Sequence, residues 1–427
     1  MSSLQRKTTR LDTDAIRDRY AHADPASVEA FWERVRRLGT PLREPGQDRA
    51  TFLWRAPHAA ERPGGAASVH LHVNRLTDKE HYDRGRMHHV PGTDIWALTL
   101  PLPRGTRASY GFTPLAPGER PPGGLPRLGH YATRRDPLNP LPALIDHGDR
   151  GLAVVCAEHA PPQPEWETDA AHEPPRGTVF RRTLPLDPAR GPDDVLGRPR
   201  PHWLYLPPDT GGELPLLTLF DAETWFGDLP LPRALEAAAD AGRLPPVAVL
   251  GIANRERLDR IACLGANADF LRGVAAGATE WAEKTAAAAG RRLAGASRRV
   301  IAGQSLGGLS ALLAALELPD SYGAALAHSA SLWWTPDGKS SPRDLGGRPG
   351  GDWITERFAA AGPRAVRLRL DVGRHEARTV PHTRTLHRTL LDRGWTAELT
   401  EYTGGHDYAW WRGALIDDLA AVLGPSR

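Results

Sequence analysis

A serine in a Gly-x-Ser-x-Gly motif is the residue whose surroundings point most clearly to chemistry. Ser305 stands between Gly303 and Gly307, after the run Val300–Gln304 and before an Ala/Leu-rich stretch. This order of strand, tight turn and helix is typical of a nucleophile elbow, which exposes the serine hydroxyl above a sheet. The glycines let the backbone turn and let the helix pack closely on the strand. The motif alone also fits a surface turn, but the flanking strand and helix favour a nucleophile.

A serine hydroxyl needs a base within hydrogen-bond reach, and α/β hydrolases supply it in the chain order serine, acid, histidine. His406 lies in Gly404-Gly405-His406-Asp407, directly after the last strand that the sequence predicts. It is therefore the candidate general base, with a structural or solvated histidine as the alternative.

The acid that orients this histidine is expected in the loop after the strand predicted at 365–370. Glu376 lies in that loop and is the first candidate, and Asp371 at the strand end is the second. Asp407 is adjacent to the histidine, and neighbouring residues rarely present their side chains to each other. A mechanism without an essential acid also remains open.

Two backbone N–H groups are needed to bind the oxyanion of the tetrahedral intermediate. One is expected from Leu306, the residue after the nucleophile. The other is expected from Ala222, in the loop after the early central strand. Asp221 and Glu223 flank Ala222, and their alternative role is to cap the following helix.

The second half of the chain alternates strands with helices. Strands are predicted at 179–184, 202–206, 214–220, 247–252, 300–302, 323–328, 365–370 and 397–402, and helices at 232–241, 270–290, after 305, 380–393 and 410–423. Such alternation predicts an α/β hydrolase, with a mostly parallel sheet covered by helices on both faces. We place this catalytic domain at 178–427, after a stiff, polar, Pro-rich linker at 161–177.

The first half has a different pattern. Apolar residues at helical spacing predict a helix over 25–35 that ends near Gly39. Short strands bounded by turn residues follow at 50–55, 68–73, 95–100, 107–112 and 152–156, and they predict a β-sandwich within 1–160. His70 and His72 share one strand face; with no third ligand evident, we expect solvated histidines and no metal site.

Composition narrows the possible functions. The 427 residues include two cysteines, which implies no disulfide framework and fits a reducing compartment. The polar N-terminus does not resemble a signal peptide, and no apolar run reaches transmembrane length. The net charge is only +3, and without zinc-finger spacing or an RNA-binding signature, nucleic acid is not an expected partner. The sequence carries no signal for oligomeric state.

Motifs along almost the whole chain resemble enterochelin esterases. Those similar to the family's N-terminal domain are Phe31-Trp32, Gly39-Thr40-Pro41-Leu42, Thr51-Phe52-Leu53-Trp54-Arg55, Pro91-Gly92-Thr93-Asp94-Ile95-Trp96 and Asp136-Pro137-Leu138-Asn139-Pro140. Those similar to its catalytic domain are Asn267-Ala268-Asp269-Phe270, the run from Ala302 to Leu312, Ser329-Ala330-Ser331-Leu332-Trp333-Trp334, Gly404-Gly405-His406-Asp407 and Trp411-Arg412-Gly413.

The resemblance implies a cytoplasmic enzyme that hydrolyses the ester backbone of a ferric tris-catecholate siderophore and so releases iron. Iron would be part of the substrate, and no cofactor is expected. The resemblance also implies an immunoglobulin-like N-terminal domain that helps to form the substrate site. Two positions depart from the family: Ala222 stands where glycine is usual, and Cys263 stands where an acidic residue is usual.

A ferric tris-catecholate is a large anion with flat aromatic rings. Guanidinium groups carry a permanent positive charge and stack on rings, so candidate substrate contacts are Arg260, Arg374 and Arg412. Candidate aromatic contacts are Trp225, Trp333 and Trp334, and Trp410 and Trp411 also lie in loops or element ends near the predicted active site. The alternatives are solvated arginines and tryptophans of the core.

Two other functions remain open at this point. One is a general carboxylesterase or acyltransferase on the same scaffold. The other is a siderophore-binding protein that keeps the serine turn without using it in catalysis.

Overall fold

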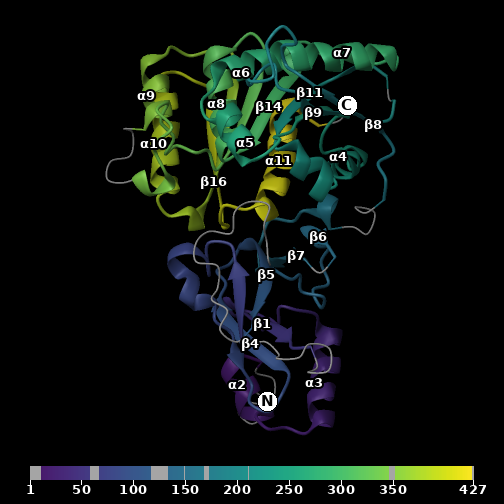
Figure 1. Cartoon of the computed structure of the whole chain (residues 1–427), viewed down its shortest axis with the longest axis vertical. Helices are drawn as coiled ribbons and strands as arrows, with labels where there is room; N and C mark the ends of the chain where they lie inside the picture. Colours follow the sequence, from purple (N-terminus) through teal and green to yellow (C-terminus); the bar gives the residue numbers. More distant parts are fainter. Residues whose placement is uncertain are drawn as a thin grey trace. The chain divides into compact units, whose positions relative to one another are not determined.

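The computed structural model describes residues 11–57, 67–116, 133–148, 150–167, 173–209, 211–345 and 352–425. The chain divides into two compact units (Figure 1). The first is Met1–Pro162 with Thr403–Trp410, and the second is Gln163–Tyr402 with Trp411–Arg427. This division differs from the predicted ranges, because the segment that carries His406 belongs to the first unit.

The first elements in the described part of the first unit are two helices, α2 (Thr13–Tyr20) and α3 (Pro25–Leu38). The side chain of Asp24 caps α3 by accepting a hydrogen bond from the Ser27 N–H, and Pro25 occupies the first helical position. Gly39 ends α3 with a φ of 74°. The predicted helix and its end are thus confirmed, whereas α2 was not predicted.

Two antiparallel sheets form the rest of the first unit. One has the order β1 (Arg49–Arg55), β4 (Ile95–Pro101), β3 (His88–His89). The other has the order β2 (Ser68–Val73), β5 (Arg107–Leu115), β7 (Arg150–Cys156), β6 (Ile145–His147). A short helix, η1 (Lys79–Gly85), follows β2. Side chains of both sheets, among them Phe52, Trp96, Leu71 and Phe112, share one hydrophobic core.

The expectation that His70 and His72 are solvated is wrong. Both side chains are buried. His70 stacks on the Tyr82 ring at 3.9 Å between centroids, and its Nε2 is 2.8 Å from the Tyr82 carbonyl oxygen. Burial lowers the pKa of both histidines, so they are neutral members of the packed interior.

An eight-stranded mixed sheet forms the centre of the second unit. Its order is β17 (Ala397–Tyr402), β16 (Arg367–Gly373), β15 (Ala324–His328), β14 (Arg299–Gln304), β11 (Leu216–Phe220), β12 (Ala248–Ile252), β9 (Arg200–Leu206), β8 (Thr178–Leu184). Neighbours from β17 to β12 are parallel, and β9 is antiparallel to both β12 and β8. The prediction of a mostly parallel sheet is confirmed. The strands β10 (Glu213–Leu214) and β13 (Arg292–Leu293) form a separate parallel pair.

Helices connect these strands and cover both faces of the sheet (Figure 1). They are α4 (Leu231–Asp240), α5 (Arg257–Leu264), α6 (Ala268–Gly273), α7 (Thr279–Ala288), α8 (Leu306–Glu317), α9 (Trp353–Ala360), α10 (Thr379–Asp392) and α11 (Tyr408–Leu423). Short helical turns are η2 (Pro164–Trp166), η4 (Thr224–Asp228), η5 (Val274–Ala278), η6 (Ala296–Arg298), η7 (Pro342–Asp344) and η8 (Arg374–Glu376).

The strand β15 shows which helices lie on which face. Ala325 and Ala327 belong to the core that α8 also fills, whereas the alternate residue His328 contacts Asp418 of α11. Successive side chains of a strand point to opposite faces, so α8 and α11 cover opposite sides of the sheet. The residues of α8 from Leu306 to Leu316 are all buried, which explains its uniformly apolar sequence.

The predicted stiff, polar linker is packed only in part: Gln163, Glu165 and Trp166 are buried, whereas its other described residues are exposed or half-buried. The Trp166 side chain is 1% exposed, and Glu165 forms an ion pair with Arg243. Gln163 accepts a hydrogen bond from the Arg412 guanidinium. Glu165 and Trp166 are thus part of the second unit.

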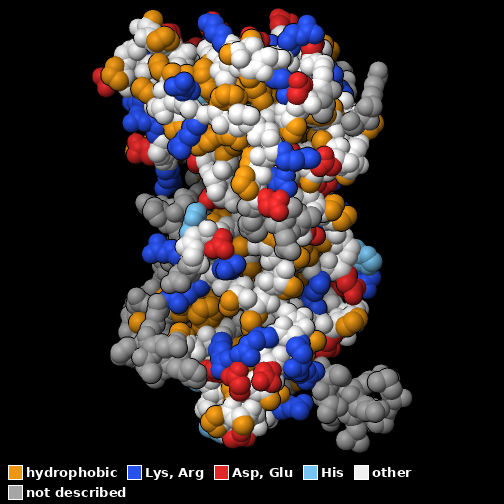
Figure 2. All heavy atoms as spheres, turned by 90° about the vertical axis from the view of Figure 1, so that its right-hand side faces the viewer, with side chains coloured by type: hydrophobic (Ala, Val, Ile, Leu, Met, Phe, Trp, Pro, Cys, Tyr) orange, Lys and Arg blue, Asp and Glu red, His pale blue; other side chains and the backbone are white. Residues whose placement is uncertain are grey.

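On the face shown in Figure 2, basic and acidic side chains of the described residues are interspersed. None of the described helices combines the length and the apolar character needed to cross a membrane.

Replacement of Trp166 by alanine should destabilise the second unit by about 3–5 kcal/mol, because it empties a large, fully enclosed volume. The measurement is chemical denaturation followed by intrinsic fluorescence and circular dichroism. Glu173→Ala is the matched control, since it removes only an exposed ion pair with Arg233 and should cost less than about 1 kcal/mol. Equal stability of the two variants would show that Trp166 does not pack as described.

Candidate active site

Ser305 lies at the sharp turn between β14 and α8, as predicted. Its φ of 58° and ψ of −116° are unusual for a residue with a side chain. The turn is held because the Ser305 N–H donates to the His328 carbonyl oxygen at 2.9 Å, and the Leu309 N–H donates to the Ser305 carbonyl oxygen at 3.1 Å. Strain of this kind at a nucleophile is a feature of the elbow motif.

The turn depends on backbone contact between β14 and α8. A Cβ atom at Gly303 would lie 2.4 Å from the carbonyl carbon of Gly307. A Cβ at Gly308 would lie 3.1 Å from the His328 carbonyl oxygen. These distances explain why small residues flank Ser305: any side chain at Gly303 would separate the helix from the strand.

A second serine lies beside Ser305. The Ser331 hydroxyl oxygen is 3.1 Å from the Ser305 hydroxyl oxygen, and the Ser331 N–H donates to the Ser305 carbonyl oxygen at 3.0 Å. Sequence reasoning did not assign a role to Ser331. The available signal was its position two residues beyond Ser329, in the loop that follows β15.

The register of the sheet places the two predicted oxyanion donors at the same edge. Leu219 of β11 pairs with Ala302 of β14, so Ala222 and Ser305 each lie three residues beyond paired positions. The N–H groups of Ala222 and Leu306 occupy first-turn helical positions, which have no intrahelical acceptor. Among the described residues, no backbone carbonyl accepts a hydrogen bond from either N–H group. Both N–H groups therefore keep their donor capacity, although Ala222 has no exposed surface in this structure.

The Ala222 methyl group, at a position where the resemblance implies glycine, is accommodated by β12. Ala222 is fully buried, and its Cβ packs over Gly251, where an added Cβ would lie only 2.8 Å away. Because Gly251 has no side chain, the methyl group fits against the sheet. The alanine therefore does not force the loop away from Ser305.

Arg260 anchors this loop rather than presenting a free charge. Its guanidinium forms two hydrogen bonds with the Asp221 carboxylate, at 2.6 and 2.8 Å. Asn254 donates to Asp221 and to Glu223. The interpretation of Asp221 and Glu223 as helix caps is wrong, because their side chains bind Asn254 and Arg260 instead. The Arg260 charge is already neutralised by Asp221, which argues against the predicted substrate contact.

Three more predicted substrate contacts are buried. Trp225 has no exposed surface and donates its indole N–H to the Gln304 side-chain oxygen at 3.1 Å. Arg412 is 3% exposed and lies 5.5 Å above the Trp166 ring. Trp334 belongs to the hydrophobic core. The structure places these side chains in the interior, as it does Trp410 and Trp411.

Two of the predicted contacts remain accessible. The Arg374 side chain is 60% exposed and lies 3.6 Å from the Glu401 carboxylate. Trp333 is partly buried and packs edge-to-face on Trp334, with ring centroids 5.7 Å apart. These two residues keep surface that a ligand can reach.

The two candidate acids point in different directions. Glu376 ends η8 and accepts hydrogen bonds from the Gly373 N–H at 3.0 Å and from the Ser329 hydroxyl. Ser329 and Ser331 belong to one short loop, so Glu376 and Ser305 contact the same loop. Asp371 instead turns toward α11 and is 1% exposed. Of the two carboxylates, Glu376 is therefore the one that lies beside the loop that Ser305 contacts.

His406 is held by a residue that the sequence analysis did not identify. The His406 N–H donates to the Asn74 side-chain oxygen at 2.9 Å, and the Asn74 amide donates to the His406 carbonyl oxygen at 3.0 Å. Asp407 accepts hydrogen bonds from the N–H groups of Ser109 and Ala409. Asn74 is 332 residues away in the chain, so no local pattern could have revealed it.

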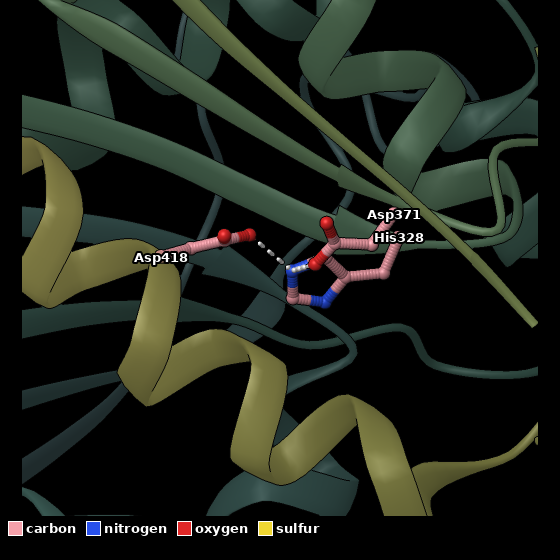
Figure 3. Close-up of side chains that lie close together, drawn as sticks. All are labelled: His328, Asp371 and Asp418. Atoms are coloured by element: carbon pink, nitrogen blue, oxygen red, sulfur yellow. Dashed lines mark hydrogen bonds and ion pairs between the residues drawn. The ribbon is translucent and has the colours of Figure 1, made fainter. Parts of the chain in front are cut away.

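A buried polar cluster lies between the sheet and α11 (Figure 3). The His328 Nε2 atom is 3.0 Å from the Asp418 carboxylate and 3.5 Å from the Asp371 carboxylate. Burial, and then the negative charge of Asp418, raises the pKa of Asp371 well above its usual value. Burial opposes ionisation of Asp418 too, but hydrogen bonding by His328 and the charge of Arg369 lower its pKa. Asp371 is therefore the protonated member of the pair.

Among the described residues, this cluster is the group whose spacing could hold a metal ion, with ligand atoms within 4.8 Å of one another. Both Asp418 oxygens already have partners, since one faces His328 and the other accepts from Arg369. The charge of Asp418 is thus balanced by the protein itself.

The serine elbow and the mixed sheet covered by helices define an esterase with an α/β-hydrolase-like fold. Residues 194–422 match the family model described as putative esterase, and residues 49–166 match the one described as enterochelin esterase, N-terminal. The chain belongs to the enterochelin esterase family. It is 37% identical to the iron(III) salmochelin esterase of Escherichia coli O6:H1, a match that covers 96% of this chain and 97% of the relative.

Other relatives and solved structures agree. The iron(III) enterobactin esterase of Dickeya dadantii is 31% identical over 93% of both chains. The crystal structure of ferric enterobactin esterase from Salmonella typhimurium aligns with a TM-score of 0.75 at 26% identity, covering 92% of this chain and 98% of that one. An enterobactin esterase from Shigella flexneri, crystallised in the presence of enterobactin, aligns with a TM-score of 0.70 at 25% identity, over 93% and 99%.

The substitution Gly303→Ala should destabilise the protein by about 3 kcal/mol, because the new methyl group overlaps the Gly307 backbone. Differential scanning calorimetry provides the measurement. Gly307→Ala is the control: its Cβ would meet Phe220 at an ordinary 3.4 Å, and alanine favours the helix, so stability should change by less than about 1 kcal/mol. If Gly303→Ala were as stable as the control, the close contact would not exist.

Proposed function

We propose that this esterase hydrolyses the ester backbone of a ferric tris-catecholate siderophore and releases iron in the cytoplasm. The observation that carries the proposal is the match over nearly the whole chain, both units included, to iron(III) salmochelin and enterobactin esterases. Iron enters as part of the substrate, and no resident cofactor is required. Partners other than the siderophore, such as nucleic acid or a membrane, are not part of the proposal.

Ser305 is the proposed nucleophile. Its Oγ forms a bond to the ester carbonyl carbon while its proton passes to His406. The negative oxygen of the tetrahedral intermediate accepts hydrogen bonds from the N–H groups of Leu306 and Ala222. The carbon–oxygen bond to the leaving alkoxide then breaks, and His406 returns the proton to that oxygen. Water attacks the acyl-enzyme in the same way, which yields a carboxylic acid and restores Ser305.

Glu376 is proposed to orient His406 and to stabilise its positive charge during the reaction. Two facts support this role. Its carboxylate is fixed by Gly373 and Ser329, and it contacts the same loop as Ser305.

The substrate is an anion with aromatic rings, and two accessible side chains suit it. Arg374 offers a positive charge, and Trp333 offers a ring face. We further propose that the two sheets of the first unit form an immunoglobulin-like domain that helps to bind the siderophore.

The natural substrate is proposed to be a siderophore of the same class as iron(III) salmochelin and iron(III) enterobactin, which appear in the names of the relatives. Identity is 37% with the salmochelin esterase and 28–31% with the enterobactin esterases. Mass spectrometry of the products from iron(III) salmochelin, iron(III) enterobactin and their iron-free forms will rank these substrates. Preference for simple aryl or acyl esters would instead identify a general carboxylesterase or acyltransferase.

Ser305→Ala should lower kcat by at least about 10⁴-fold, because the nucleophile is lost while the fold remains. Siderophore hydrolysis is measured by product chromatography, and circular dichroism checks the fold. A fluorophosphonate probe should label the wild-type protein at Ser305 and leave the variant unlabelled. Substantial hydrolysis by the variant would reject the mechanism, and a wild-type protein that binds siderophore without being labelled would be a binding protein.

Glu376→Gln should lower kcat by about 10²–10⁴-fold, because the neutral amide cannot stabilise a charged His406. Asp371→Asn is the matched control: a protonated carboxyl and an amide can both donate a hydrogen bond, so kcat should change by less than about 3-fold. Steady-state kinetics on the siderophore distinguishes the two acids. A greater loss in Asp371→Asn than in Glu376→Gln would reverse the assignment.

A further inference from the structure

A row of polar side chains crosses three neighbouring strands directly below the catalytic loops. Gln304 of β14 pairs in register with His328 of β15, which pairs with Asp371 of β16. Ser305 and Ser329 are the next residues along β14 and β15. The His328 and Asp371 side chains point toward Asp418 of α11, as Figure 3 shows. The row therefore lies on the face of the sheet that α11 covers. Its member on β14, Gln304, directly precedes Ser305.

The hydrogen bonds of this row specify the orientation of the Gln304 amide. The Trp225 indole N–H can only donate, so the amide oxygen must face Trp225, at 3.1 Å. The amide nitrogen then faces the His328 Nδ1 atom, at 3.2 Å. Because an amide N–H donates, Nδ1 must accept, and the proton of the neutral imidazole lies on Nε2.

The far end of the row supports this arrangement. With its proton on Nε2, His328 donates to Asp418 at 3.0 Å. The other Asp418 oxygen accepts from the Arg369 guanidinium. All of these groups except Arg369 are buried. In such surroundings an unpaired polar atom is costly, so Gln304, His328 and Asp418 each hold a neighbour in one orientation.

The side chain of Gln304 is one of two links between the proposed halves of the oxyanion hole. The other is the Arg260 guanidinium, which binds Asp221 and donates to the Gln304 carbonyl oxygen at 3.4 Å. Backbone pairing between β11 and β14 ends at Leu219 and Ala302, so it does not hold the loops beyond. The loop after β11 carries Ala222 and continues into η4, which includes Trp225. The Trp225–Gln304 hydrogen bond therefore connects that loop to the residue before Ser305.

We propose that Gln304 is a positioning residue that fixes the Ala222 N–H relative to Ser305 and the Leu306 N–H, and that His328 holds Gln304 in the orientation this requires. The proposal rests on the proposed function, because it assigns a role in ester hydrolysis. Gln304 does not touch the reacting atoms. It acts by keeping two backbone donors at the separation that the oxyanion needs.

Gln304→Leu tests the proposal, because leucine fills a similar volume and cannot bond to Trp225 or His328. The expected result is a fall of about 10²-fold in kcat for siderophore hydrolysis, with KM within about 3-fold, since displacement of a catalytic group by about 1 Å has an effect of this size. The rate of Ser305 labelling by a fluorophosphonate should fall in parallel, because phosphonylation also uses the oxyanion hole.

The labelling rate separates failure of this proposal from failure of the proposed function. A wild-type protein that is labelled but does not hydrolyse siderophores would overturn the substrate assignment alone. A Gln304→Leu variant that is labelled at the wild-type rate would overturn the positioning role, whatever the substrate.

Two variants of His328 keep the test independent of the Gln304 substitution. His328→Asn places an amide oxygen where Nδ1 stood and so keeps an acceptor for Gln304, whereas His328→Leu removes it. Both lose the bond to Asp418 and should lose stability. The labelling rate should be at least about 10-fold higher in His328→Asn than in His328→Leu. Equal rates in the two variants would contradict the proposal.

His382→Gln is the control for disturbance of a buried histidine. It alters another buried histidine–aspartate pair. The Nδ1 atom of His382, on α10, lies 3.2 Å from the carboxylate of Asp352, which precedes α9. Its thermal stability should fall, while its labelling rate should stay within about 2-fold of wild type. A loss of labelling as large as that of Gln304→Leu would show that the effect reflects stability alone.

Discussion

Direct backbone contact between β14 and α8 is the constraint on which the catalytic end of the second unit depends. Because Gly303 has no side chain, the backbone of Gly307 can lie against it, and the helix begins immediately after the strand. This proximity forces Ser305 into a positive φ and brings the Leu306 N–H to the start of the helix. The turn, the proposed nucleophile and one proposed oxyanion donor thus follow from a single packing requirement.

The polar row beneath the serine meets a second requirement. Loops beyond the ends of parallel strands are not held by the sheet, yet an oxyanion hole needs two of them at a constant distance. The buried contacts of Gln304, His328 and Asp418 provide fixed geometry there, because a polar group in a low-dielectric interior tolerates few orientations. Arg369 offsets the charge that this arrangement would otherwise leave unpaired.

Several arginines and tryptophans that suit an aromatic anion have structural roles instead. Arg260 binds Asp221 at the oxyanion loop, Trp225 binds Gln304, and Arg412 lies over Trp166. In the sequence, the type of these residues and their proximity to a motif could not show whether they have a structural role or contact the substrate. A guanidinium or an indole serves equally well to tie a loop to a core, and the difference is its burial and its partner, which are properties of the folded chain.

The sequence by itself determined the elements with strong local signals: the helix that Asp24 and Gly39 delimit, the alternation that predicts a mostly parallel sheet, and the elbow around Ser305. These signals are local because caps, periodicity and glycine conformations involve a few neighbouring residues. Tertiary structure alone decided which side chain meets which. It turned Asp371 toward α11 and fixed Glu376 beside Ser329, and it held His406 through Asn74, because contacts between distant residues leave no periodic trace in the chain.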